Sequence, residues 1–194
     1  MQRDGSDGNQ ELARPLISRL DRAVALGPCE EVCGEIKSAL EDLLASGTRF
    51  LPRHLLTPSP DCYARRLLHL DPEGRYSAVV MVWAPGQSTP LHDHDGKWCV
   101  EGVYCGRIRV TSYALEEKTE CGKFRFAHES ETDAARGEAG SLIPPHEYHT
   151  IANPFDELAA TVHVYCGEMN HCHIFVPDDG GMHKRECRDL TYSS

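Results

Sequence analysis

From residue 63 onward, the sequence consists of short apolar runs separated by turn residues, and this pattern limits the possible folds most strongly. Turn-forming stretches such as Asp71-Pro72-Glu73-Gly74, Cys105-Gly106 and Pro144-Pro145 separate the runs. Short strands at this spacing are typical of an antiparallel sandwich or barrel. The expected strands cover residues 63–70, 75–84, 98–104, 107–115, 123–128, 140–143, 149–152, 158–165 and 171–176.

The first third of the chain has a different pattern. Residues 13–26 carry apolar side chains at helical spacing, and a second such run begins after Gly27-Pro28, where Gly47 is expected to end it. We expect both helices to pack on the outside of the strands. The predicted organisation is a disordered N-terminus (1–12), two helices and a proline-containing connector (13–60), a catalytic barrel (61–180) and a C-terminal tail (181–194).

Composition excludes several classes of partner. The net charge is −10, so we expect no binding to nucleic acid or to anionic membrane surfaces. No apolar run is long enough to span a bilayer, and the polar N-terminus lacks the apolar core of a signal peptide. We therefore expect a cytoplasmic protein, and we expect it to be a monomer. The nine cysteines are an odd number and are expected to be mostly free thiols.

Two histidines stand at i and i+2 in Pro90-Leu91-His92-Asp93-His94. On a strand, such residues project from the same face about 6 to 7 Å apart, so both imidazoles can reach one metal ion. The alternative is a pair of exposed histidines in a polar turn, and a bare His-x-His pattern does not decide between the two. Turn glycines on both sides, Gly86 and Gly106, place the pair between two strands.

The wider spacing, Gly86-x5-His92-x-His94-x4-Cys99-x6-Gly106, resembles the first signature of the cupin superfamily of metal-binding jelly-roll barrels. Cys99 stands in place of the usual glutamate ligand. The segment Pro144-x4-His149-x3-Asn153 resembles the second signature, although His146 occupies the customary glycine position. The resemblance implies a mainly β, cupin-type double-stranded β-helix barrel. It also implies that His92, His94 and His149 are the metal ligands.

Three further segments make residues 60–176 resemble the thiol dioxygenases, and among them the cysteine dioxygenase family. They are Tyr63-Ala64-Arg65, Thr161-Val162-His163-Val164-Tyr165 and Cys172-His173-Ile174-Phe175, with Thr161 replacing a serine. The resemblance implies that Tyr63 and Arg65 bind a substrate carboxylate. It also implies catalytic roles for Tyr165, His163, Thr161 and Cys99, and a thioether cross-link between Cys99 and Tyr165.

The chemistry of the histidines can be argued independently of the family. Three neutral imidazoles leave a divalent ion its full charge and open positions, which favours an incoming thiolate. Iron(II) suits both thiolate and oxygen, whereas zinc accepts the same ligands but has no redox chemistry. We therefore expect Fe²⁺ as the cofactor. The period of a strand places Thr161, His163 and Tyr165 on one face, where His163 is expected to orient Tyr165.

Several assignments have structural alternatives. Strand parity alone does not choose between Arg65 and Arg66 as the inward arginine, and only the Tyr-x-Arg match favours Arg65. His163 and Tyr165 could be core residues, and Cys99 could be no more than a small buried apolar residue. Seven histidines are expected to be non-ligands, with His146 the foremost exception: His54, His69, His128, His146, His171, His173 and His183.

The resemblance implies an iron(II) dioxygenase that adds both atoms of O₂ to L-cysteine, giving cysteine sulfinic acid in cysteine catabolism. An alternative within the class is a dioxygenase for 3-mercaptopropionate, mercaptosuccinate or another small thiol. An alternative from another class is a non-catalytic metal-binding cupin. Oxygen consumption with a thiol separates the last possibility from the others.

Overall fold

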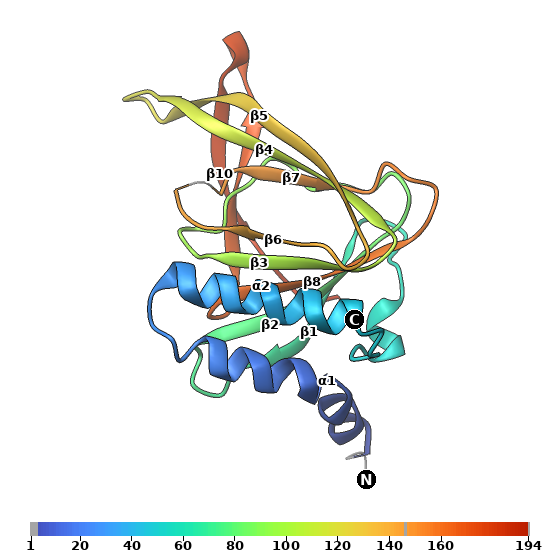
Figure 1. Ribbon diagram of the computed structural model, residues 1–194. Helices are drawn as coiled ribbons and strands as arrows, with labels where there is room; N and C mark the ends of the chain where they lie inside the picture. The colour runs from blue at the N-terminus through green and yellow to red at the C-terminus, as the bar shows by residue number, and fades with distance from the viewer. Residues whose placement is uncertain (1–3, 146, 194) are drawn as a thin grey trace.

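The computed structural model describes residues 4–145 and 147–193, and within them ten strands form two five-stranded antiparallel sheets. The first sheet has the order β1-β2-β8-β3-β6, and the second has the order β7-β4-β5-β10-β9 (Figure 1). The strands are β1 (Ala64–Leu70), β2 (Tyr76–Trp83), β3 (Cys99–Cys105), β4 (Arg107–Lys118), β5 (Lys123–Ala135), β6 (Ala139–Leu142), β7 (His149–Ala152), β8 (Ala159–Cys166), β9 (His171–Pro177) and β10 (His183–Asp189).

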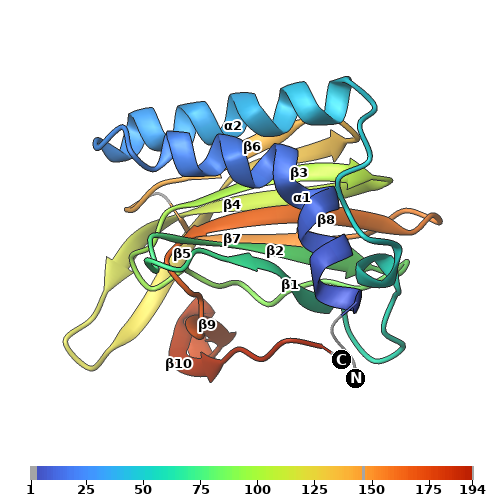
Figure 2. The same ribbon diagram turned by 90° about the horizontal axis from the view of Figure 1, so that it is seen from below.

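Two helices, α1 (Asp4–Ala23) and α2 (Cys29–Ala45), cover the outer face of the first sheet (Figures 1 and 2). Their apolar side chains form one core with the outward-facing residues of β2, β3 and β8, for example Leu40 with Val80 and Val162. A Cβ atom at Gly102 of β3 would lie 3.2 Å from Leu44 Cδ1, so the glycine lets α2 approach the sheet closely.

Alternate residues of the same strands face the interior between the two sheets. In β2 these are Val79, Met81 and Trp83, which belong to a second core. Met81 pairs with Thr161 of β8, and Val79 pairs with His163, so the polar residues of β8 share this interior face. The fold is therefore mainly β, a cupin-type jelly roll with N-terminal helices outside, as the sequence predicts.

All nine expected strands are present, and two further expectations are corrected. The first helix begins at Asp4, so residues 4–12 are helical and not disordered, while residues 1–3 lie outside the described residues. The expected C-terminal tail contains β10, which pairs with β9 along its length and with the start of β5. Its mostly exposed sequence, HKRECRD, lacks the apolar alternation that predicts a strand.

The expected connector contains a short 3-10 helix, Arg53–Leu56, and a second one, Asp179–Gly181, precedes β10. None of the helices in the described part of the chain is long and apolar enough to cross a membrane.

Candidate functional site

A narrow pocket of about 30 Å³ lies in the interior between the sheets. Most of the residues singled out in the sequence line it. They are Tyr63, Arg65, His92, His94, His149, His163 and Tyr165. Thr161 and Cys99 lie beside these residues on β8 and β3, within contact of His163. The structure therefore brings together residues that are up to about a hundred positions apart in the sequence.

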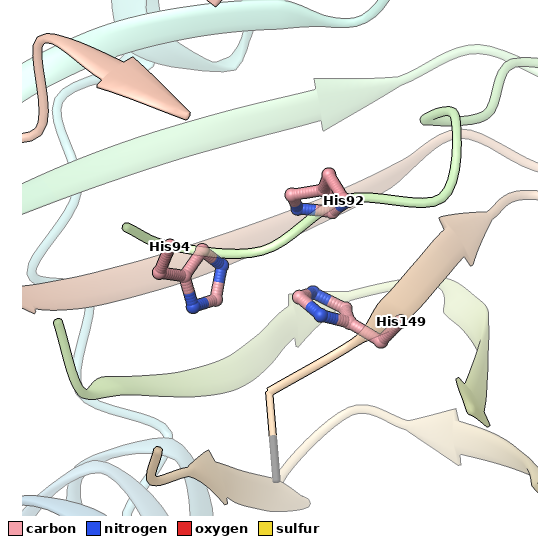
Figure 3. Close-up of side chains that lie close together, drawn as sticks. All are labelled: His92, His94 and His149. Carbon is pink, nitrogen blue, oxygen red and sulfur yellow. The ribbon is translucent and has the colours of Figure 1, made fainter. Parts of the chain in front are cut away.

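The segment that carries His92 and His94 forms only isolated bridges, and not the regular strand that the His-x-His spacing predicts. The backbone N–H of His92 donates to the carbonyl of His149 over 3.1 Å, and the N–H of His149 donates back over 3.2 Å. His92 also bridges to Ile174 of β9. His92 therefore pairs with both edge strands of the second sheet, β7 and β9, and this pairing holds it opposite His149 (Figure 3).

The three imidazoles face a common point. Their ring centroids are 4.3 Å apart for His92 and His149, 4.9 Å for His94 and His149, and 5.4 Å for His92 and His94. One nitrogen from each ring lies within 4.8 Å of the others. This spacing is suited to ligands of one divalent metal ion, which would lie between the rings.

Hydrogen bonds determine which nitrogen each ring presents. The Nδ1–H of His149 donates to the carbonyl of Glu147 over 2.8 Å, and that of His92 donates to Pro90 over 3.1 Å, which leaves both Nε2 atoms as free acceptors. Nε2 of His149 and Nδ1 of His94 are buried and have no hydrogen-bond partner among the described residues. Orphaned buried nitrogens of this kind fit a metal site.

The electrostatics of the pocket keep the imidazoles neutral. Burial lowers the pKa of His92, and it lowers the pKa values of His94 and His149 well below the usual range, with the neighbouring rings adding to the effect. A neutral imidazole is the form that binds a metal. The site is therefore ready for a cation at neutral pH.

Arg65 and Arg66 occupy opposite faces of β1, which resolves the choice that parity left open. Arg65 lines the pocket and is 4% exposed. Its Nη2 donates to the carbonyl of Met169 over 2.7 Å, while Nε and Nη1 have no partner among the described residues. Arg66 instead donates to the carbonyls of Leu55 and Thr57 in the connector. A buried guanidinium with two free donor groups is suited to an anionic ligand.

Aromatic and C-terminal residues complete this end of the pocket. Tyr63 stacks on Trp83 with the ring centroids 4.6 Å apart. The ring of Tyr192 lies under the Arg65 guanidinium at 4.6 Å, and Arg188 of β10 also lines the pocket. Sequence reasoning missed Tyr192 and Arg188, because the C-terminal segment was expected to be a tail and no motif includes them.

Thr161 bonds His163 directly, with 2.8 Å between Oγ1 and Nε2. The indole N–H of Trp83 donates to the same Oγ1 over 3.0 Å, so the threonine hydroxyl is fixed from both sides. His163 was also expected to orient Tyr165. The two rings lie nearly parallel with their centroids 6.0 Å apart, and no hydrogen bond joins them in the described part of the chain. Any orienting effect of His163 on Tyr165 therefore acts through ring packing.

Glu101 is a further buried polar residue that sequence reasoning missed. Its Oε2 lies 3.3 Å from Nδ1 of His163, and Cys99 Sγ lies 3.9 Å from the same nitrogen. Burial raises the pKa of Glu101 to about 7. The strand period contained a usable signal, since Glu101 follows Cys99 by two residues and must share its face of β3.

The histidines expected to be non-ligands lie outside the three-histidine group wherever the structure describes them. His171 and His173 contact the carboxylates of Asp95 and Asp93 over 2.8 and 3.1 Å. His146 lies outside the described residues. Asn153 of the second motif has a structural role, because its amide donates to the carbonyls of Trp83 and Glu157.

Two solved structures illustrate the distant likeness of this chain to known folds. A Thermus thermophilus protein, TT1209, shares 20% identity over 59% of this chain and 92% of its own, with a TM-score of 0.46. A Klebsiella pneumoniae protein with a double-stranded β-helix domain shares 19% identity over 60% and 88%, with a TM-score of 0.45.

Sequence relatives give the family. Human cysteine dioxygenase type 1 is 22% identical over 123 residues, and the bovine enzyme is 21% identical over 122 residues. Each match covers 63% of this chain and only 60% of the relative. The family described as cysteine dioxygenase type I matches residues 58–177, which is more than half of the 194 residues. The chain belongs to the cysteine dioxygenase type I family.

Proposed function

We propose that the protein is an iron(II)-dependent thiol dioxygenase that converts L-cysteine and O₂ to cysteine sulfinic acid. One observation carries the proposal: three neutral imidazoles, two of them fully buried, share a narrow pocket with a buried arginine that has two free donor groups. The histidines suit a cation that binds a thiolate, and the arginine suits a carboxylate. A small thiol that carries an acid group satisfies both ends.

In this proposal His92, His94 and His149 hold the iron, which when bound supplies thiolate binding and one-electron chemistry with O₂. Arg65 receives the substrate carboxylate on Nε and Nη1, while Tyr63 lines the pocket beside it. These contacts orient the substrate sulfur toward the histidines. The overall reaction is RSH + O₂ → RSO₂⁻ + H⁺, with both oxygen atoms on sulfur.

The side chains beside the metal pocket have separate roles. We assign Thr161 to the positioning of His163, on the basis of their 2.8 Å contact. Tyr165 lies with its ring centroid 5.4 Å from that of His94 and is proposed to face the reacting sulfur. Cys99 leaves the position of the usual cupin carboxylate ligand without a charge, and it is proposed to form the thioether bond to Tyr165.

A second candidate substrate is favoured by Arg188, which adds a further cation to the lining of the pocket. Mercaptosuccinate carries two carboxylates, one for Arg65 and one for Arg188. A lower KM for mercaptosuccinate than for L-cysteine, lost in Arg188→Met, would support this substrate. 3-Mercaptopropionate is the comparison substrate, because it lacks both the second carboxylate of mercaptosuccinate and the amine of L-cysteine.

The test is anaerobic loading with iron(II), followed by addition of oxygen and each of a set of small thiols. Oxygen uptake matched one-to-one by sulfinate, detected by mass spectrometry, supports the proposal. Tight iron binding without oxygen uptake for any thiol would favour the non-catalytic metal-binding cupin instead. The cytoplasmic location, the monomeric state and a place in cysteine catabolism stay predictions from the sequence.

A further inference from the structure

A second cavity, of about 290 Å³, lies between the two sheets. Residues of β3 and β6 form one wall, and residues of β4 and β5 form the other. Thr132 and Ser141, which are exposed, take part in the lining, so the cavity reaches the surface. Ser112 adds a third hydroxyl, and the lining also contains two glutamates and apolar residues such as Val110 and Ala134. The cavity has the polar groups that ordered water requires.

Glu101 connects this cavity to a residue of the metal pocket. The residue lines the cavity, whereas its neighbour His163 lines the metal pocket. Glu101 is only 6% exposed. Its Oε2 lies 3.3 Å from Nδ1 of His163 and has no hydrogen-bond partner among the described residues. A buried carboxylate without a full set of partners is costly to maintain, so its place here calls for an explanation.

The proposed reaction supplies a reason. A sulfinic acid is ionised at neutral pH, so the conversion of RSH and O₂ to RSO₂⁻ releases one proton in a narrow, largely buried pocket. We propose that Glu101 and the second cavity form the route by which this proton leaves. His163 takes up a proton at Nε2 as it passes the proton on Nδ1 to the Glu101 carboxylate, and water in the cavity carries it to the solvent. The transfer leaves the ring neutral, which agrees with its low pKa of about 3, caused mainly by burial. The inference rests on the proposed function.

The surroundings of Glu101 suit such a role. The titratable groups around it are Cys99 on its own strand, His163 and Tyr165 on β8, and Glu138 at the cavity wall. Thr161 occupies the Nε2 side of His163, which leaves Nδ1 directed toward Glu101. Burial raises the pKa of Glu101 to about 7, so its carboxyl group can both take up and release a proton at neutral pH.

Glu101→Gln keeps the shape of the side chain but cannot carry a proton, and Glu101→Asp restores the acid. We expect Glu101→Gln to lower kcat for the thiol on the order of a hundredfold, the lower end of the effect of a positioned proton carrier. In Glu101→Gln, KM and iron content should stay at the wild-type values, and the solvent deuterium isotope effect on kcat should rise. Glu101→Asp should recover part of the rate. Loss of iron in Glu101→Gln would overturn the proposal, because Glu101 would then belong to a metal site.

The cavity is tested separately by Ala134→Phe, which fills it, with Ala135→Phe as the matched control on the opposite face of β5. Infrared spectra of the metal-free protein provide a readout that needs no activity. We expect a protonated carboxyl band that disappears as the pH rises through neutrality, exchanges rapidly in D₂O, and is absent from Glu101→Gln. Ala134→Phe should slow both exchange and turnover, whereas Ala135→Phe should change neither.

These outcomes distinguish the two proposals. If the wild type oxidises no thiol, the proposed function fails, while the infrared exchange still reports on the route. If the enzyme is active but Glu101→Gln retains the full rate with an unchanged pH profile, only the proton route is wrong. A carboxyl band that exchanges equally fast with the cavity filled would also overturn it.

Discussion

Cys99 of β3 and Tyr165 of β8 stand directly opposite each other in the antiparallel register, and both side chains are buried. Burial raises the pKa of the Cys99 thiol well above its usual range, and the hydroxyl of Tyr165 acts on this pKa in the opposite direction. Directly opposed residues in antiparallel strands bring their Cβ atoms to about 4.5–5.5 Å, which is close enough for a direct link between the side chains. The register thus supplies the proximity that the thioether bond requires, without any change of the backbone.

The first prediction is that this bond forms during turnover. Joining the sulfur to the ring carbon beside the hydroxyl removes two hydrogens, and O₂ accepts the two electrons and two protons. Protein aged with iron, oxygen and cysteine should yield a joined Cys99–Tyr165 peptide, two hydrogens lighter than the sum of its parts. Cys99→Ser should yield none, and iron-free protein should yield none. Intact separate peptides from an active, aged sample would contradict the prediction.

The second prediction concerns the metal ligands. His149→Ala leaves two imidazoles, and even changes outside the ligand shell typically weaken metal binding about 10- to 100-fold. We therefore expect iron affinity to fall by at least about a hundredfold, measured as iron content after gel filtration. The control is His128→Ala, at an exposed position away from the pocket, which should retain full iron. Wild-type iron content in a folded His149→Ala protein would exclude the three-histidine site.

The third prediction concerns the carboxylate contact. Arg65→Met keeps much of the volume but removes the guanidinium, and a hydrogen bond to a charged group contributes roughly 1.5–3 kcal/mol. We expect kcat/KM for L-cysteine to fall roughly 10- to 150-fold, mainly through KM, with iron content unchanged. Cysteamine, which lacks the carboxylate, is the matched substrate. Its already low kcat/KM should hardly change, and an equal loss for both thiols would show that Arg65 does not bind the acid group.

Much of the fold could be predicted because each expected strand has its own local signal. Apolar runs bounded by turn residues are present at β2 and β8, and β9 follows the same rule with its apolar centre. The failures lie where that signal is missing. β10 is polar and mostly exposed, and it is held by backbone pairing to β9, an interaction between strands that leaves no trace in local periodicity.

The candidate site divides in the same way. The spacing of the histidines and the strand period predicted His92, His94 and the inward face of β8. Arg188 and Tyr192 were missed, because they reach the pocket only through the path of the C-terminal segment. Parity could also have identified Glu101, but no motif drew attention to it. Its significance depends on the cavity behind it, which is formed by four strands and is not encoded in any one of them.

The last prediction concerns stability, and it follows from the raised pKa of Glu101. Unfolding restores the ordinary value of 4.5, whereas the folded protein holds the proton up to a pKa of about 7. Between these values the native state binds more protons, so this contribution to stability is fully present below pH 4.5 and is lost as the pH rises through 7. The difference of about 2.5 pKa units corresponds to about 3 kcal/mol.

Glu101→Gln removes this dependence. In urea unfolding of the metal-free protein, the variant should gain about 3 kcal/mol relative to the wild type between about pH 4.5 and pH 8. The histidines, whose pKa values burial lowers, change stability in the opposite direction with pH, but they do so equally in both proteins and cancel in the difference. Glu129→Gln, at an exposed position of β5, should track the wild type at every pH. Parallel curves for Glu101→Gln and the wild type would mean that Glu101 is ionised in the folded protein throughout this range.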